Sequence, residues 1–295
     1  MRTGRSTLPP GGPSSVARAP RTVARRGGVG VGARPASDPA TRALGAGATA
    51  LIAFVMLLPP AMTVALSFSD ERFFAFPPHV WGWRQYQALF EDPRWGSALL
   101  LSLEIALPVA LLSSAVVVPA LFVFHRSRLP GRNALQLGGL TGLVLPVSAY
   151  AVAMYGVFAQ VGLLGTYLGL VLADSTLAIP VMLLVCSPAL SRLPEELELA
   201  AMVTGASRAR AWLGITLPLL APAILAGAVL AFMTSFDESV FVVFLGGAGQ
   251  ETLPRAIFDS VRFGLEPVVA AITALLILGT SAVMVFAVRL TRAGR

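Results

Sequence analysis

The sequence predicts an all-α, polytopic membrane protein with six transmembrane helices. The chain has 295 residues, of which 56% are apolar and only 13% are charged, whereas an ordinary soluble domain carries about 25% charged residues. The apolar residues gather in runs of about 20 or more, the length that crosses a hydrocarbon core of about 30 Å. The arginines lie mainly in alternate segments between these runs, which is typical of a chain that crosses a membrane repeatedly.

Composition also excludes several classes of function. All 22 basic residues are arginine, and the net charge is +7. The sequence shows neither a contiguous basic face nor interleaved aromatic residues, so it predicts no nucleic-acid partner. The single cysteine, Cys186, lies inside an apolar run and excludes an intrachain disulfide or a cysteine-based metal cluster. His79 and His125 fall in separate predicted loops, so we expect no metal site.

The first 40 residues are rich in Pro, Gly, Ser, Ala and Arg. Such a segment buries too little apolar surface to offset the entropy lost on ordering, which predicts a disordered basic cytoplasmic tail. Two interpretations of this tail stay open: it contacts lipid on the cytoplasmic face, or it is a dispensable extension at the start of translation. The predicted membrane domain is therefore 41–295.

Six apolar ranges are predicted to span the membrane: 44–68, 97–123, 134–159, 167–189, 219–245 and 268–290. Prolines fall inside or beside five of them, namely Pro59, Pro60, Pro108, Pro119, Pro146, Pro180 and Pro222. Proline is tolerated in a membrane helix because neighbouring helices satisfy the freed backbone groups. This many breaks is more typical of a transporter than of a rigid anchor.

Arginine placement predicts the orientation. If the N-terminus lies inside the cell, 17 arginines fall in cytoplasmic segments and five fall outside, namely Arg72, Arg84, Arg94, Arg255 and Arg262. Positive residues favour the cytoplasmic side of short loops. Six spans then place both termini in the cytoplasm. The external segment 69–96 contains Trp81, Trp83 and Tyr86, which predict a short amphipathic helix at the membrane interface or a docking surface for a soluble partner.

A polar segment, 190–218, separates the fourth and fifth apolar ranges. Glu195, Glu196 and Glu198 follow Pro194 and favour the start of a helix. Gly205 is predicted to end that helix with a positive φ, and Pro218 to open the fifth span. The residues alone therefore predict a helix, a turn and a second helix across the cytoplasmic ends of the spans, with no assigned purpose.

The spacing within this segment resembles a family motif. Binding-protein-dependent permeases of ATP-binding-cassette (ABC) importers carry Glu-Ala-Ala, three residues, Gly, nine residues and Ile-x-Leu-Pro. The matching positions here are Ala200, Ala201, Gly205, Ile215, Leu217 and Pro218. Leu199 stands at the position of the motif glutamate, and Glu198 lies one residue earlier. The resemblance implies a type I ABC importer permease bundle whose coupling loop, 190–218, docks into a groove on the ATPase subunit.

The resemblance narrows in the second half of the chain. Residues 234–238, 252–254 and 262–267 resemble the spermidine/putrescine permeases, specifically their C-type membrane subunit. Related permeases for amino acid derivatives, aminoethylphosphonate or iron share much of this pattern. The resemblance implies a bacterial inner-membrane importer with three partners: an ATPase dimer, a second homologous permease and an extracytoplasmic solute-binding protein. The chain lacks lysine and hence a phosphate-binding loop, so a partner subunit is expected to bind ATP, and this chain to be no enzyme.

Four acidic residues fall within or near predicted spans: Glu104, Asp174, Asp237 and Glu238. An Asp at the centre of a membrane helix costs about 2.5–3.5 kcal/mol on insertion scales, so such groups usually face a cavity or a partner. Carboxylates along a path suit a cationic solute, and Phe236 and Phe241 are placed to add cation–π contact. Protonation, local hydrogen bonds to the backbone or a position near a helix end are the structural alternatives.

Two other classes of protein fit less well. An ion-coupled secondary transporter would be expected to show an inverted repeat, and none is evident in the six ranges. An intramembrane enzyme would require a nucleophile with its base or a metal site, for which the sequence offers no His or Cys cluster. The sequence therefore favours an importer permease.

Overall fold

The computed structural model describes residues 39–126, 130–264 and 266–293. The predicted tail, 1–40, lies outside these ranges except for its last two residues. Contacts divide the chain into two units, 1–54 and 55–295. The described part of the first unit is the beginning of helix α1 (Pro39–Ser67), and α1 continues into the second unit. Helices are the regular elements of the described ranges, where the β-type pairing is a single bridge between Ser69 and Trp81.

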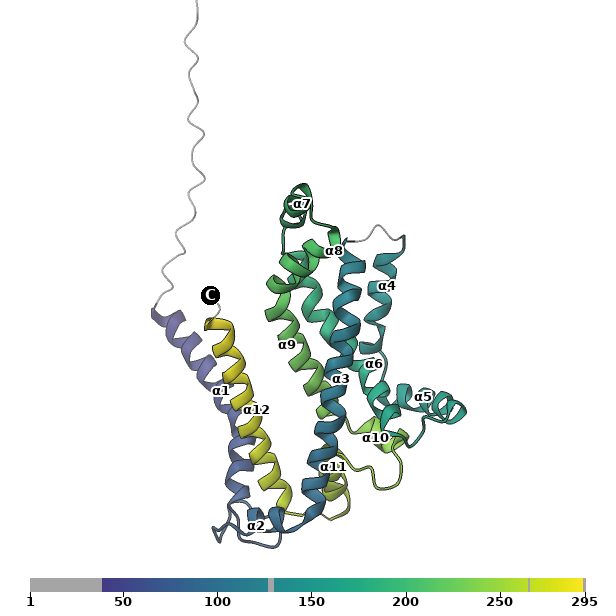
Figure 1. Ribbon diagram of the computed structural model, residues 1–295. Helices are drawn as coiled ribbons and strands as arrows, with labels where there is room; N and C mark the ends of the chain where they lie inside the picture. The colour runs from purple at the N-terminus through teal and green to yellow at the C-terminus, as the bar shows by residue number, and fades with distance from the viewer. Residues whose placement is uncertain (1–38, 127–129, 265, 294–295) are drawn as a thin grey trace, which may run out of the picture. The chain divides into compact units, whose positions relative to one another are not determined.

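Three helices form the centre of the second unit: α3 (Pro93–Arg126), α6 (Tyr167–Ser191) and α9 (Leu217–Phe236). Each packs against the other two, and they run side by side in Figure 1. Small residues permit this close packing. At Gly227 of α9, an added Cβ would lie 2.9 Å from Cγ of Met182 and 3.0 Å from Sγ of Cys186, both on α6. Apolar burial thus concentrates along the lines where these three helices meet.

The third predicted span, 134–159, is not one continuous helix. It is divided into α4 (Arg132–Gly139), a 3₁₀ turn η1 (Thr141–Leu143) and α5 (Val147–Val161), with a bend of 105°. Glycines and a proline lie at the break. Pro146 disfavours helical geometry in the residue before it, and an added Cβ at Gly142 would lie 3.1 Å from the Thr176 carbonyl oxygen. The segment that was predicted to be one kinked helix is therefore two helices separated by a sharp break.

The fifth predicted span, 219–245, also has different limits. A continuous helical stretch begins earlier, through α8 (Arg208–Ala211) and the π-helical segment η2 (Trp212–Thr216), and α9 ends at Phe236. A short helix, α10 (Val240–Leu245), follows after a break. Pro218 has no amide hydrogen to donate within the helix, and the wider π turn lies directly before it. The second helix of the polar segment is thus continuous with the fifth span.

The all-α membrane fold is confirmed, whereas six uninterrupted helices are not. Four helical stretches in the described ranges are long and apolar enough to cross a membrane, namely Ala43–Ser67, Pro93–Arg126, Tyr167–Ser191 and Arg208–Phe236. The bent pair α4–α5 would be a fifth. Helix α12 (Val268–Ala293) covers the sixth predicted range, although the apolar part assessed there, Val268–Ala282, is shorter than a full span.

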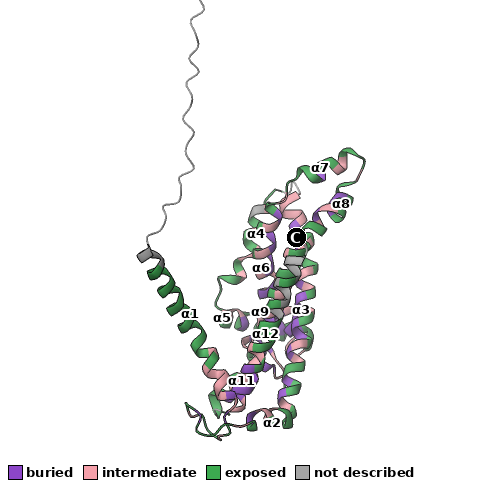
Figure 2. Cartoon of the chain, turned by 90° about the vertical axis from the view of Figure 1, so that its left-hand side faces the viewer, coloured by how far each residue is buried: buried purple, intermediate pink, exposed green. Residues whose placement is uncertain are grey.

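The two ends of this bundle carry different elements. One end bears α7 (Glu196–Val203) and α8, while α2 (Arg84–Glu91), α10 and α11 (Leu253–Phe263) lie at the other (Figure 1). Helix α2 falls within the segment for which an amphipathic helix was predicted, and it contacts α3 and α12. Figure 2 shows that most of α1 is exposed, and most residues of α5 are exposed as well. Such apolar exposure fits helices that meet lipid or another membrane subunit.

Candidate functional site

The coupling loop folds as a helix, a turn and a second helix, as predicted. Helix α7 ends near Gly205, whose φ is +97°. The Gly205 amide donates to the Met202 carbonyl, and the Ala206 amide donates to the Ala201 carbonyl, 3.0 Å away in each case. Ser207 then caps α8, because its Oγ accepts the Arg210 amide at 3.3 Å. Positive φ is readily accessible to glycine, which explains why Gly205 suits this turn.

The motif residues divide between the surface and the interior of the coupling loop. Ala200, Gly205 and Pro218 are exposed, whereas Ala201, Ile215 and Leu217 are partly buried. The outward face of α7 carries three exposed apolar residues, with Leu197 43%, Leu199 52% and Val203 88% exposed, together with the exposed acid Glu196. An apolar tip of this kind at the end of a bundle offers a contact surface to another protein.

Glu198 does not belong to this outward face. Only 4% of the residue is exposed. Its Oε1 accepts a hydrogen bond from Nε of Arg126 at 2.8 Å and another from Oγ1 of Thr216 at 2.5 Å. Although Glu198 is adjacent to the motif glutamate position in sequence, one step along a helix turns a side chain by about 100°. The carboxylate therefore lies inside the coupling loop while Leu199 lies outside.

Arg126 is the functional candidate that the sequence did not reveal. This last residue of α3 has a side chain that is 7% exposed, and it pairs with Glu195 as well as Glu198. Its own carbonyl oxygen accepts a hydrogen bond from Nη1 of Arg208 at 2.8 Å. Because its acidic partners lie about 70 residues away in sequence, no local pattern identifies the contact. The sequence indicated only that Arg126 lies on the arginine-rich side.

Among the membrane carboxylates, Asp174 is the most deeply buried. It lies on α6 with 2% exposure, and its Oδ2 accepts a hydrogen bond from Oγ of Ser235 on α9 at 2.5 Å. Its Oδ1 has no hydrogen-bond partner among the described residues. Asp174 and Ser235 thus join the two helices that pack most closely in the bundle.

Asp237 and Glu238 follow the end of α9 rather than lying inside the fifth span. Asp237 is exposed, and Glu238 is partly buried. Oε1 of Glu238 accepts the backbone amides of Val240 at 2.5 Å and Phe241 at 3.3 Å. A carboxylate at this place satisfies free amides in the first turn of α10. Glu238 therefore has the local backbone bonds that the sequence left open as an alternative, whereas Asp237 faces outward.

Glu104 has a different environment, since it is exposed on α3 between the exposed apolar residues Leu100 and Leu107. The hydroxyl of Tyr167 donates to the backbone carbonyl oxygen of Glu104, so this hydrogen bond does not involve the Glu104 carboxylate. A carboxylate on an apolar membrane-facing surface is costly unless a partner or water-filled space lies against it. Glu104 is therefore placed for contact with something outside this chain.

The two phenylalanines differ in accessibility. Phe236 is partly buried and stacks on Phe232, with ring centroids 5.7 Å apart. Phe241 is fully buried and packs edge-on against Tyr150, with centroids 6.0 Å apart. Phe241 is a core residue, so the expected cation–π contact with a solute is wrong for this position in the structure. Phe236 remains adjacent to Asp237 and Glu238.

The four acids share one half of the bundle. Glu104 lies closer to the start of α3 than to Arg126, and Asp174 lies only two helical turns into α6. Asp237 and Glu238 follow the last residue of α9. These are the ends of α3, α6 and α9 that lie away from α7 and α8 (Figure 1). The four carboxylates therefore lie in the half of the bundle that is remote from the coupling loop.

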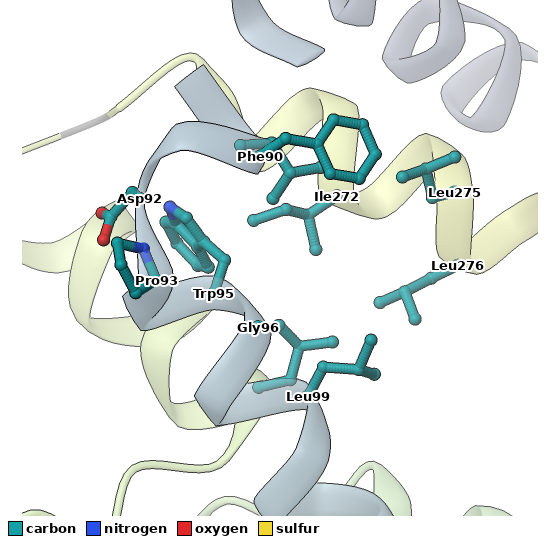
Figure 3. Close-up of a pocket in the computed structure, with 11 residues that line it drawn as sticks. Phe90, Asp92, Pro93, Trp95, Gly96, Leu99, Ile272, Leu275 and Leu276 are labelled. Carbon is teal, nitrogen blue, oxygen red and sulfur yellow. The ribbon is translucent and has the colours of Figure 1, made fainter. Parts of the chain in front are cut away.

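The same end of the bundle contains an ion pair and an apolar cavity. Arg94 binds both carboxylate oxygens of Glu251, at 3.0 and 2.7 Å, and this contact lowers the pKa of Glu251 below its usual value. The cavity has a volume of about 230 Å³, and Trp95, Leu99 and Ile272 are among its lining residues (Figure 3). Its apolar lining suits a hydrocarbon chain better than a charged solute.

Comparison with known proteins agrees with this architecture. The family model described as "Binding-protein-dependent transport system inner membrane component" matches residues 106–293. An alginate-importing bacterial ABC transporter has a similar fold, with a TM-score of 0.60 and 16% identity over 86% of this chain and 96% of that one.

Several relatives have stated transport roles. The putrescine transport system permease protein PotI of Escherichia coli K12 is 32% identical over 251 residues, covering 80% of this chain and 86% of the relative. The spermidine/putrescine permease PotC of Haemophilus influenzae is 29% identical, covering 80% of this chain and 92% of the relative. The molybdenum permease ModB of Mycobacterium tuberculosis is 30% identical, covering 68% and 84%. The chain therefore belongs to the binding-protein-dependent transport system inner membrane components and is a membrane permease component of an ABC importer.

Proposed function

We propose that this permease imports a small organic cation, and specifically a polyamine such as putrescine or spermidine. The observation that carries the proposal is the position of four carboxylates in the half of the bundle that is remote from the coupling loop. An ammonium group that leaves water requires compensating negative charge. PotI and PotC each align with 80% of this chain and are named as putrescine and spermidine/putrescine permeases, which supports the same class of solute.

Two of these carboxylates are accessible from outside the chain. Glu104 is exposed on α3, and Asp237 is exposed after α9. We assign both to the solute path, together with Glu238 and the ring of Phe236 beside them. We assign Asp174 an indirect role. Its hydrogen bond to Ser235 holds the last turn of α9 in place, and Asp237 follows directly after that turn.

The coupling loop is the proposed contact with the motor. Its exposed face carries Leu197, Leu199 and Val203 and offers an apolar surface to an ATPase dimer. We place this end in the cytoplasm because it carries Arg126, Arg192, Arg208 and Arg210, and we assign both termini to the same side. The opposite end then faces a solute-binding protein that delivers the cation.

A second homologous permease completes the proposed path. Among the described residues Glu104 forms no ion pair, and we assign its charged or polar partner to a facing permease subunit. ATP binds to the ATPase subunits, whose closure and reopening move the coupling loop. The bundle then alternates between two packed states that expose the carboxylates to opposite sides of the membrane.

The test is uptake of labelled putrescine by vesicles that contain the complete importer. The double variant Asp237→Asn/Glu238→Gln removes two charges of the proposed path, and we expect a decrease of about tenfold or more, equivalent to about 1.4 kcal/mol. Glu91→Gln, an exposed acid on α2, is the matched control and should transport at the wild-type rate. Wild-type uptake by the double variant at equal abundance would remove these acids from the path. A wild-type complex that transports phosphonates, iron or amino acid derivatives but no polyamine would refute the solute assignment.

A further inference from the structure

We propose that Arg126 and Glu198 form a latch that makes α3 move together with the coupling loop. The proposal rests on the function proposed above, in which the coupling loop transmits movement from an ATPase. It adds a route for that movement. Helices α6 and α9 are joined to the coupling loop through the backbone, whereas α3 lies far from it in sequence and must be held by side chains.

Arg126 anchors the α3 side of the latch. Its guanidinium spans two residues of the coupling loop, with Nε 2.8 Å from Oε1 of Glu198 and Nη1 2.8 Å from Oε1 of Glu195. Its Nη2 also donates to the Leu193 carbonyl oxygen at 3.5 Å. The Arg208 side chain returns a hydrogen bond to the Arg126 carbonyl oxygen. One residue of α3 therefore contacts both helices of the coupling loop.

Glu198 and the π-helical segment form the other side. The same carboxylate oxygen that accepts from Arg126 also accepts from Thr216, the last residue of η2. The adjacent packing contact is apolar, since Phe122 of α3 meets Trp212 of η2 edge-on with ring centroids 5.1 Å apart. Glu198 thus joins the end of α3 to the beginning of α9 through two hydrogen bonds.

Burial makes this contact a rigid connection. The side chains of Arg126 and Glu198 are 7% and 5% exposed. A charge-assisted hydrogen bond shielded from water is short and directional, and leaving either partner alone in this environment is unfavourable. The Arg126–Glu195 contact is different, because the Glu195 side chain is 64% exposed. We therefore assign the latch to Glu198 and regard Glu195 as an auxiliary contact.

The location of the acid distinguishes this chain from the motif that it resembles. The motif places its glutamate at position 199, which is exposed here and occupied by leucine. In this chain the acid stands one residue earlier and faces Arg126. Contact with the motor is then left to the exposed residues of α7, while Glu198 acts within the permease.

The first experiment measures coupling in the complete importer with its ATPase, partner permease and binding protein. We expect Arg126→Ala and Glu198→Gln to retain the bound ATPase and basal ATP hydrolysis. Solute transported per ATP hydrolysed should fall by about tenfold. Arg84→Ala and Glu91→Gln remove the same charges from exposed positions on α2, at the end of the bundle remote from the coupling loop, and should behave as wild type. The charge-reversed pair Arg126→Glu/Glu198→Arg should recover part of the lost coupling.

A second measurement does not depend on the solute. With Cys186 replaced by serine, spin labels at Val116 on α3 and Ala209 on α8 report the separation of α3 from the coupling loop; both native residues are exposed. We expect nucleotide binding to leave a narrow distance distribution in the wild type and to broaden it in Arg126→Ala. If the distributions agree and the single variants remain coupled, the latch is refuted. Absence of polyamine uptake by the wild type, with the spin-label result as expected, would refute only the solute proposal.

Discussion

The packing of α6 against α9 makes a sharp prediction at Gly227. In the structure, an added Cβ would lie 2.9 Å from Cγ of Met182 and 3.0 Å from Sγ of Cys186. Neither neighbour retreats easily, because Met182 is fully buried and the Cys186 thiol donates to the Ala223 carbonyl oxygen at 3.4 Å. Gly227→Ala therefore forces the two helices apart.

The expected magnitude follows from two opposing effects. Overpacking of a close-packed interior costs about 1–3 kcal/mol, whereas replacing glycine by alanine within a helix gains about 1 kcal/mol. We expect Gly227→Ala to be destabilising by about 1 kcal/mol. The control is Gly156→Ala on α5, where an added Cβ meets nothing within 4 Å, and the helix gain should remain.

Thermal unfolding of the purified permease is the assay. A change of 1 kcal/mol corresponds to about 2–4 °C in Tm for a chain of about this size. Gly227→Ala should lower the Tm by about this amount, and Gly156→Ala should not lower it. Equal shifts of the two variants would show that the contact between α6 and α9 is looser than described, and the reasoning would fail.

Two further predictions concern the ends of the bundle. Gly205→Ala places a side chain at a φ of +97°, where backbone strain rather than lack of space is the cost. We expect the free energy of unfolding to fall by about 1–2 kcal/mol, and an unchanged Tm would contradict the turn geometry. For Glu251, Arg94 lowers the folded-state pKa, so the stabilising contribution is present above the ordinary pKa of 4.5 and is lost as pH falls through the lowered value. The contact is partly exposed, and Glu251→Gln should cost under about 1 kcal/mol at pH 7, with the difference from wild type vanishing in acid, where Glu251 is protonated. A difference that persists at low pH would exclude this origin.

Much of the helical fold was predictable from the sequence because apolar length is a strong signal. The ranges 97–123 and 167–189 correspond closely to α3 and α6. The range 134–159 failed as a single helix, since its glycines and Pro146 act together to break the chain rather than to bend it. Hydropathy does not distinguish these outcomes, because the two helices taken together are still apolar enough to count as one span.

The candidate site was predictable as a segment but not as a set of contacts. Spacing correctly located the turn at Gly205. It did not reveal that Glu198 faces inward, because this depends on the rotational position of α7, nor that Arg126 is its partner, because the two residues are 72 positions apart. Phe241 was expected near a solute, yet tertiary packing places it in the core.

The most direct test of the account asks which side of the membrane the coupling loop faces and whether the motor covers it. The single native cysteine is buried, so a cysteine introduced by Val203→Cys, at a position 88% exposed, can be probed with an impermeant maleimide. We predict labelling in inside-out vesicles, protection when the ATPase is bound, and no labelling in intact cells. Labelling from outside the cell, or labelling that the bound ATPase leaves unchanged, would contradict the role assigned to the coupling loop.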